Sequence, residues 1–369
     1  MDSPLCRTET PPEPSPARDT FGRPLRELRL SVTDRCNFRC RYCMPSDSIR
    51  ETDFLPRPEI LTFEEIARLA RLFVSEFGVH KLRVTGGEPL LRRELPVLVR
   101  WLAEIPGATD LALTTNGFWL AEHAPALRDA GLSRITISLD SLDASEFARM
   151  SGSSPLRAQA RHDRVLAGID AAIAAGFERL KINCVVIAGQ NEGAILPLAE
   201  RFRGTPHIVR FIEYMDVGTQ NGWETDQVIS AAEIVRRIGN VWPLEAVDAN
   251  HRGEVAQRFR YRDGGGEIGV IASVSQPFCG DCQRARISAD GQLITCLFAQ
   301  AGADLKGPLR RGASDAELAA RVREVWSARS DRYSEARAEL ARAAAAQPVL
   351  GTARGAGTRR RLEMYHVGG

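Results

Sequence analysis

Residues 36–43 read Cys-Asn-Phe-Arg-Cys-Arg-Tyr-Cys, so Cys36, Cys40 and Cys43 follow the spacing C-x3-C-x2-C. This short loop can turn three thiolates toward one point, but it offers no fourth ligand. A structural zinc site is closed by four ligands, and a simple electron-transfer [4Fe-4S] cluster uses four cysteines. A [4Fe-4S] cluster on three thiolates leaves one iron open for another molecule. The spacing therefore favours such a cluster, with zinc as the alternative.

A second set of three cysteines, with the spacing C-x2-C-x13-C, lies far along the chain at Cys279, Cys282 and Cys296. Six of the eight cysteines therefore belong to two sets of three. Because C-x2-C is also half of a common zinc site, zinc and an iron–sulfur cluster both remain open for the second set. Cys6, near the N-terminus, and Cys184, in an apolar run, are expected to be plain thiols.

The composition fits a cytoplasmic enzyme. The 369 residues suffice for one large barrel or two domains, and a hydrophobic content of 44% can form a sizeable core. Lys and Arg number 49 against 47 Asp and Glu, which argues against a nucleic-acid binder. Clustered cysteines indicate a reducing compartment rather than a disulfide framework. No apolar run reaches about 18 residues, so no membrane-spanning segment is expected.

Strand and helix patterns alternate after the first cysteines. Thr62 and Glu65 form a capping box before a helix that reaches Phe77. We expect strands at 28–32, 81–85, 110–114, 134–139, 180–187 and 207–213, and further helices near 94–105, 120–130, 162–175 and 191–203. This alternation predicts right-handed βαβ units and a parallel sheet, hence an α/β fold. Six such units would form an incomplete (βα)6 TIM-like barrel.

Three regions are expected along the chain. Residues 1–24, rich in Pro and polar residues, are predicted to be a disordered tail. Residues 25–216 would form the partial barrel. Residues 217–369 would form a C-terminal domain, which carries the second cysteine set in a loop and hairpin region and then a helix over 314–347.

Polar residues follow or occupy the predicted strands, as in barrels whose chemistry lies at the carboxyl ends of the strands. The strand at 81–85 is followed by Gly86-Gly87-Glu88-Pro89, and two others end in Thr114-Thr115-Asn116-Gly117 and Ser138-Leu139-Asp140-Ser141. The last two strands carry Lys181, Asn183, Arg210 and Glu213, with Met215 after them. Because polar residues occur at the same level of five strands, a functional site is predicted at the carboxyl ends of the strands.

The first cysteine set, followed by Met44-Pro45 and by Gly86-Gly87-Glu88-Pro89 on the next strand, resembles the radical S-adenosylmethionine superfamily. The chain from about residue 25 to 369 further resembles the GTP 3′,8-cyclase family. The specific motifs are Leu-Arg-Leu-Ser-Val-Thr-Asp-Arg-Cys, Arg-Val-Thr-Gly-Gly-Glu-Pro-Leu, Leu-Thr-Thr-Asn-Gly, Val-Arg-Phe-Ile-Glu-Tyr-Met, Cys-x2-Cys-x-Arg-x-Arg and a terminal Gly-Gly.

The resemblance implies roles for particular residues. It assigns Cys36, Cys40 and Cys43 to one [4Fe-4S] cluster and Cys279, Cys282 and Cys296 to a second. S-adenosylmethionine would bind at Tyr42, Gly87, Ser138 and Met215. GTP would bind at Arg29, Arg83, Thr114, Lys181, Arg284 and Arg286, with Lys81 and Arg210 nearby. Arg284, Arg286, Gly368 and Gly369 would also take part in catalysis.

The reaction implied is the first step of molybdenum-cofactor biosynthesis. Reductive cleavage of S-adenosylmethionine would lead to hydrogen abstraction from C3′ of GTP and attack on guanine C8, giving (8S)-3′,8-cyclo-7,8-dihydroguanosine 5′-triphosphate. The implied partners are an electron donor such as flavodoxin or ferredoxin and the downstream cyclic pyranopterin monophosphate synthase, with the chain as a homodimer.

Two other classes remain as alternatives. The first is another radical S-adenosylmethionine enzyme, such as a peptide maturase with an auxiliary cluster, although such enzymes usually carry additional C-terminal cysteines. The second is a zinc-bearing nucleic-acid-binding protein, which would present a basic face with interleaved aromatics; aromatic residues here make up 7%.

Overall fold

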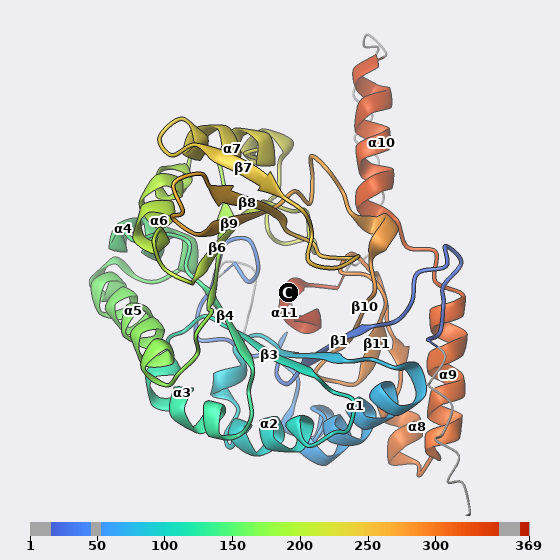
Figure 1. Ribbon diagram of the computed structural model, residues 1–369. Coiled ribbons are helices and arrows are strands. Elements are labelled where there is room, and N and C mark those ends of the chain that lie inside the picture. Colours follow the sequence, from blue (N-terminus) through green and yellow to red (C-terminus); the bar gives the residue numbers. More distant parts are fainter. Residues whose placement is uncertain (1–15, 46–52, 347–361, 369) are drawn as a thin grey trace, which may run out of the picture.

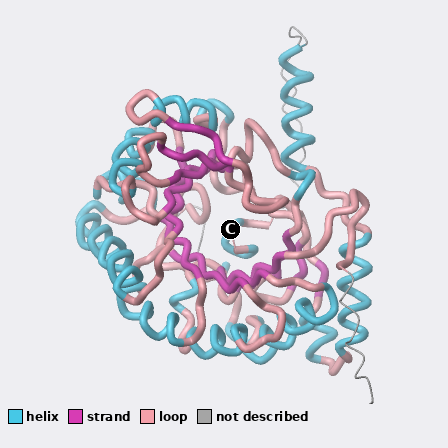
Figure 2. The backbone as a smooth tube through the Cα atoms, in the orientation of Figure 1, coloured by secondary structure: helices cyan, strands magenta, loops and turns pink. Residues whose placement is uncertain are grey.

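The computed structural model describes residues 16–45, 53–346 and 362–368. Strands line the inside of the molecule and most helices cover the outside, as Figures 1 and 2 show. The long helix near the C-terminus projects away from this body, whereas the last described residues lie inside the ring of strands (Figure 1).

The first half of the chain alternates strands and helices as expected. Its strands are β1 (Glu27–Ser31), β2 (Lys81–Thr85), β3 (Asp110–Thr115), β4 (Arg134–Ser138), β5 (Lys181–Val186) and β6 (Ile208–Glu213). Its helices are α1 (Phe63–Phe77), α2 (Leu95–Ala103), α3 (Leu120–Asp129), α4 (Ala144–Ser151), α5 (Ala158–Ala174) and α6 (Ile195–Phe202). The six strands pair in parallel in chain order, which is the predicted (βα)6 arrangement.

The second half adds strands to both edges of the same sheet. Its strands are β7 (Leu244–Val247), β8 (Gln257–Tyr261), β9 (Glu267–Ile271), β10 (Arg284–Ile287), β11 (Gln292–Ile294) and β12 (Ala303–Asp304). Its helices are α7 (Ala231–Gly239), α8 (Lys306–Arg310), α9 (Asp315–Ser327), α10 (Tyr333–Ala346) and α11 (Met364–Val367).

The strand order is β12-β11-β10-β1-β2-β3-β4-β5-β6-β9-β8-β7. β9 pairs in parallel with β6, and β10 pairs in parallel with β1. The segment predicted as a separate C-terminal domain therefore continues the sheet of the barrel on both sides. The division at residue 216 stays a prediction.

The core lies between this sheet and the outer helices. α1 shows how the sequence specifies it: the Thr62 hydroxyl accepts a hydrogen bond from Glu65 N, and the Glu65 carboxylate accepts one from Thr62 N. This capping box satisfies two backbone donors that the helix cannot pair internally. Ile66, Leu69 and Phe73, at helical spacing, are buried against the sheet.

Two expectations about the chain ends need correction. Residues 16–24 lie within the predicted disordered tail, yet Ala17, Asp19 and Arg23 are buried. The predicted helix over 314–347 is divided into α9 and α10, because the carbonyls of Arg329 and Asp331 between them accept hydrogen bonds from Thr20 and Arg23 instead. Within the described ranges, no helix combines the length and apolar character needed to cross a bilayer.

Candidate active site

One cavity of about 590 Å³ occupies the interior of the barrel, and both cysteine sets line it. This volume is in the usual range for small-molecule sites. The structure brings the residues predicted from the sequence together around this cavity. They are Cys36, Cys40, Cys43, Cys279, Cys282 and Cys296; Tyr42, Gly87, Ser138 and Met215; and Arg29, Lys81, Arg83, Thr114, Lys181, Arg210, Arg284 and Arg286.

Strand register explains this convergence. Alternate residues of a strand share one face, and neighbouring strands here are aligned so that polar residues lie level with one another. Arg29 of β1 is level with Arg83 of β2 and with Arg286 of β10. Thr136 of β4 is level with Thr114 and Lys181 of its two neighbours. The inner face of the sheet is therefore polar and largely basic.

The two cysteine sets lie toward opposite ends of the strands. The first set follows the carboxyl end of β1. Cys282 precedes β10, which is parallel to β1, so it lies toward the amino ends. β11 is antiparallel to β10, with Ile294 paired to Arg286, and it brings the chain back toward Cys296 at the same end. Lys81, Arg134 and Lys181 are the first residues of their strands, so much of the basic character also lies toward the amino ends, not only at the predicted carboxyl ends.

Two glycines let the first cysteine loop approach the end of β2. A Cβ atom on Gly86 would lie 2.5 Å from Thr33 O, and one on Gly87 would lie 2.4 Å from Arg35 O. Gly87 N donates to Thr33 O at 2.7 Å. Any side chain here would push the two segments apart. The Gly-Gly pair thus holds the loop that carries Cys36 against the strand.

Polar side chains surround the first cysteine set. The Tyr42 hydroxyl donates to Asp140 Oδ2 at 2.9 Å, and Val185 N donates to Asp140 Oδ1 at 2.9 Å. Burial raises the pKa of Asp140 to about 6. Asn116 Nδ2 lies 3.7 Å from Cys36 Sγ. Burial also raises the pKa of the Cys36 thiol to about 12, so its thiolate requires a cation.

A single carboxylate organises the basic residues of β1 and β2. Glu27 lies 3.3 Å from Arg29 Nε and 3.3 Å from Lys81 Nζ. Burial acts to raise the pKa of Glu27, but these cations hold it well below its usual value. Lys181 has no comparable anion beside it among the described residues, and burial and the charges of Arg210 and Arg134 lower its pKa to about 7.

Several buried donors of the cavity make no hydrogen bond. Arg284 Nε and Arg286 Nε have no hydrogen-bond partner within the part of the chain that the structure describes, and Arg83 Nε has only an ion pair with Glu27 Oε1 at 3.8 Å. Buried polar groups are normally satisfied. Free guanidinium donors beside Lys81 and Lys181 therefore fit a polyanionic ligand such as a triphosphate.

The second cysteine set lies in a strongly cationic environment. Arg284 Nη2 is 3.4 Å from Cys282 Sγ. Burial opposes ionisation of this thiol, but Arg284 and Arg329 lower its pKa to about 6. All cysteines of the described residues are free thiols. Thiolates are the ligands that iron–sulfur clusters use, so this donor set fits such a group.

Neither cysteine set converges on a single metal ion. Among the residues described, no three Cys, His, Asp or Glu side chains are placed to hold one ion together. The thiolates that hold a [4Fe-4S] cluster each bind a different iron atom, so they need not meet at one point. The arrangement is compatible with clusters at both positions.

The C-terminal tail enters the cavity. Met364 lines the cavity, and Tyr365 and Val367 are buried. Gly368 lies against Thr85 at the end of β2, and Thr85 lines the cavity. Gly369 and Cys6 lie outside the described residues.

Four further residues complete the comparison between the predicted and the observed site. Glu213 is fully buried outside the cavity, where it accepts hydrogen bonds from Ala231 N, Val274 N and Ser275 N. Cys184 is buried in the core, as expected of a plain thiol. Glu27 and Arg134 line the cavity but were not singled out. Each lies an even number of residues from a predicted residue on the same strand, and so on the same face: Glu27 from Arg29 on β1, and Arg134 from Ser138 on β4.

Comparisons with known proteins agree with this geometry. The model of the radical SAM superfamily matches residues 30–202, and the model "Molybdenum Cofactor Synthesis C" matches residues 207–335. A protein of Xanthomonas axonopodis pv. citri named GTP 3′,8-cyclase is 56% identical over 89% of this chain and 96% of its own. A protein of the same name from Acidothermus cellulolyticus is 52% identical over 96% of this chain and 99% of its own. Another from Staphylococcus carnosus is 46% identical over 87% of this chain and 93% of its own.

Proposed function

The chain belongs to the GTP 3′,8-cyclase family within the radical S-adenosylmethionine superfamily, and from this membership we propose how its cavity carries out the reaction. It is an enzyme with GTP 3′,8-cyclase activity, the first step of molybdenum-cofactor biosynthesis. The superfamily implies a [4Fe-4S] cluster and S-adenosylmethionine. Family membership decides against the peptide maturase and the zinc-bearing nucleic-acid-binding protein.

The observation that carries the proposal is that two cysteine sets line one cavity, with cationic side chains between them. Cys36, Cys40 and Cys43 hold the first cluster. Tyr42, Gly87, Ser138 and Met215 contact S-adenosylmethionine at the carboxyl ends of the strands. When bound, the cluster supplies the electron that cleaves S-adenosylmethionine and so starts hydrogen removal from C3′ of GTP and ring closure at C8.

The residues of the chain bind and orient GTP. Arg29, Arg83, Lys181, Arg284 and Arg286 neutralise the phosphates by charge-assisted hydrogen bonds, and Thr114 contributes a hydroxyl. Arg83 Nη1 already contacts the hydroxyls of Thr114 and Thr136, at 3.2 and 3.3 Å, which fixes its direction. The enclosing strands exclude water from the reacting atoms.

We assign a second [4Fe-4S] cluster to Cys279, Cys282 and Cys296, which would hold it at the end of the cavity where it would bind the guanine of GTP. The proposal further includes an external electron donor such as flavodoxin or ferredoxin, transfer of the product to cyclic pyranopterin monophosphate synthase, and a homodimeric state. A reducing, cytoplasmic location is favoured by the clustered free thiols.

The test uses two triple variants, reconstituted anaerobically. Replacement of Cys36, Cys40 and Cys43 by Ala should remove about half the iron and all cleavage of S-adenosylmethionine. Replacement of Cys279, Cys282 and Cys296 should preserve that cleavage but abolish GTP conversion. Retained GTP conversion in the second variant would contradict the role of the second set. Zinc in place of iron and sulfide would contradict the cluster itself.

A further inference from the structure

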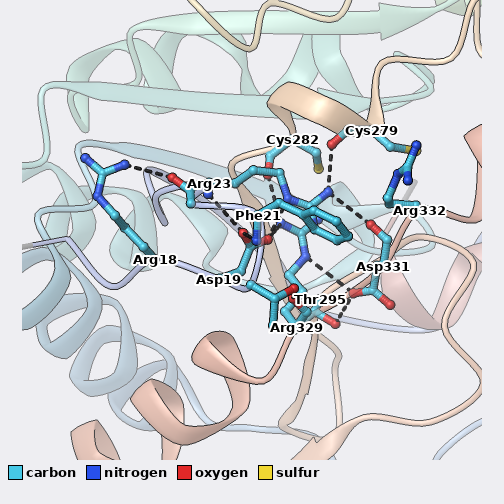
Figure 3. Close-up of polar contacts among 12 residues, drawn as sticks. Arg18, Asp19, Phe21, Arg23, Cys279, Cys282, Thr295, Arg329, Asp331 and Arg332 are labelled. Atoms are coloured by element: carbon cyan, nitrogen blue, oxygen red, sulfur yellow. Dashed lines mark hydrogen bonds and ion pairs between the residues drawn. The ribbon is translucent and has the colours of Figure 1, made fainter.

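Residues 16–24 form an ordered segment beside the second cysteine set, although their composition predicted disorder. Three charged side chains meet there: Asp19, Arg23 and Arg329, exposed by 0%, 2% and 1%. Figure 3 shows them converging between the backbone of the N-terminal segment and Cys279 and Cys282. Ionised groups are seldom buried this completely unless they are paired.

Asp19 pairs with both arginines. Its Oδ2 atom lies 2.6 Å from Arg23 Nε and 3.2 Å from Arg329 Nη1. Its Oδ1 atom accepts hydrogen bonds from the backbone N atoms of Phe21 and Arg23, at 3.0 and 2.9 Å. One carboxylate thus fixes two guanidinium groups from positions about 300 residues apart in sequence.

The arginines in turn bind the backbone of the cysteines. Arg23 Nη1 donates to Cys279 O at 2.7 Å, and Arg329 Nη1 donates to Cys282 O at 2.8 Å. Asp331 completes the connection, because its Oδ2 atom accepts from Arg329 Nε and, at 2.6 Å, from the hydroxyl of Thr295. Thr295 directly precedes Cys296, so all three cysteines are reached.

Apolar packing does not fix this part of the chain. Residues 274–284, which include Cys279 and Cys282, contain no buried residue. The short turn at Cys279–Asp281 likewise buries none of its side chains. The positions of these cysteines therefore depend on polar contacts. A buried ion network contributes little to the stability of the fold, since replacing it by apolar residues of similar volume often leaves the free energy of unfolding unchanged or raises it.

We propose that Asp19, Arg23 and Arg329 are positioning residues, which hold Cys279, Cys282 and Cys296 at the separation that a bound cluster requires. The N-terminal segment is then part of the second cysteine site. This inference rests on the proposed function, because it takes the second set to bind a cluster. Its effect on the cysteines is measurable without the cluster.

The main variant is Arg23→Lys, which retains the charge but cannot reach Asp19, Cys279 O and Asp331 O together. Arg310→Lys is the matched control. Arg310 also binds one carboxylate and two carbonyls, those of Glu65, Pro58 and Ile60, and none of these partners belongs to the network around Asp19. Thr295→Val is a milder second variant of the same size, which removes only the contact with Asp331.

The first readout is alkylation of the cysteines in cluster-free protein, followed residue by residue by mass spectrometry. In Arg23→Lys, Cys279 and Cys282 should react roughly tenfold faster, as expected when a hydrogen bond to a charged group is lost. Cys36, Cys40 and Cys43 should be unchanged. Thr295→Val should accelerate Cys296 selectively. Equal rates in Arg23→Lys and Arg310→Lys, or no change at Cys296 in Thr295→Val, would overturn the inference.

The second readout is the electron paramagnetic resonance spectrum of the second cluster, recorded in full-length protein whose Cys36, Cys40 and Cys43 are replaced by Ala. Arg23→Lys should lose or shift this signal, and Arg310→Lys should keep it. If the parent protein holds no second cluster, the proposed function fails. If the parent holds one and Arg23→Lys leaves its spectrum unchanged, only the positioning role fails.

Discussion

Gly368 lies so close to Thr85 that a Cβ atom on the glycine would be 2.4 Å from Thr85 Cγ2. Its φ angle of 66° is in the left-handed region, which other residues rarely adopt. Gly368 thus lies beside Gly86, the first of the two glycines that follow β2. Only glycine combines this backbone conformation with this close approach.

Replacing Gly368 by Ala should therefore displace the tail. The strain alone costs about 1–3 kcal/mol, so we expect product formation to fall by about fivefold to 150-fold. Deletion of Gly368 and Gly369 should abolish cyclisation, with cleavage of S-adenosylmethionine uncoupled or lost, while clusters and GTP binding are retained. Chromatographic assay of product and 5′-deoxyadenosine measures both effects. Gly312→Ala is the control, since its φ is 85° but nothing lies within 4 Å. Full product formation by the Gly368 variants would show that the tail is dispensable.

Glu363 is predicted to hold the tail in place. Its Oε1 atom accepts hydrogen bonds from Thr219 N and Oγ1, both at 2.9 Å, and Gly218 leaves the space that its carboxylate needs. Glu363→Gln should weaken contacts worth about 1.5–3 kcal/mol. Digestion from the C-terminus by a carboxypeptidase should then be faster by tenfold or more.

Glu317→Gln provides the matched comparison for Glu363. Glu317 accepts from Ser314 N and Oγ in the same way, but at an exposed helix start. Digestion of Glu317→Gln should proceed as in the native protein. Equal digestion rates in the two variants would mean that other contacts secure the tail.

GTP binding should be accompanied by proton uptake at Lys181. Its pKa is lowered to about 7 by burial and neighbouring cations, and bound phosphates should raise it again. Calorimetric titration at pH 8 in buffers of different ionisation heat should report uptake of up to about one proton, which Lys181→Met removes. Lys306→Met should not change it. Buffer-independent heats in the native protein would contradict the prediction.

The same pKa has a consequence for stability without ligand. The unfolded chain keeps this proton up to about pH 10.4, whereas the folded chain releases it near pH 7. Between these values the unfolded state binds more protons, so the contribution of Lys181 to stability rises with pH.

Arg284 and Arg286 are two residues apart on β10, so they share one face of the strand, and both line the cavity. Their Nε atoms lack a partner among the residues described, so they are expected to bind the substrate. Neutralising either residue to Gln should weaken GTP binding by about 1.5–3 kcal/mol. Equilibrium dialysis measures this, with exposed Arg236→Gln as control. Unchanged affinity would assign both arginines to the fold.

Local patterns in the sequence predicted much of the barrel. The strand over 81–85 is β2 without change, the capping box at Thr62 begins α1 as expected, and α9 begins after Ser314, where the predicted C-terminal helix starts. These features depend on residues near each other in sequence. The helix α4 was missed although Asp143 caps it through hydrogen bonds to Ser145 N and Glu146 N.

Features that depend on distant partners were not predicted. Nothing near Arg284 indicates that β10 pairs with β1, some 250 residues earlier. The segment at Asp19 looked disordered because its ordering partners, Cys279 and Arg329, lie at the other end of the chain. A segment of polar composition can therefore be ordered when residues distant in the sequence pair with its charged side chains.

The pairing of β1 between β2 and β10 gives that strand the function of a spacer. Its five residues, about 17 Å long, separate the loop of the first cysteines from the level at which the second set lies. A side chain on β1 can be exchanged without altering this length, whereas one inserted or deleted residue would both change it and turn the alternating faces over. Evolution of this enzyme is therefore expected to preserve the number of residues between the start of β1 and Cys36, even at positions whose side chains do not line the cavity.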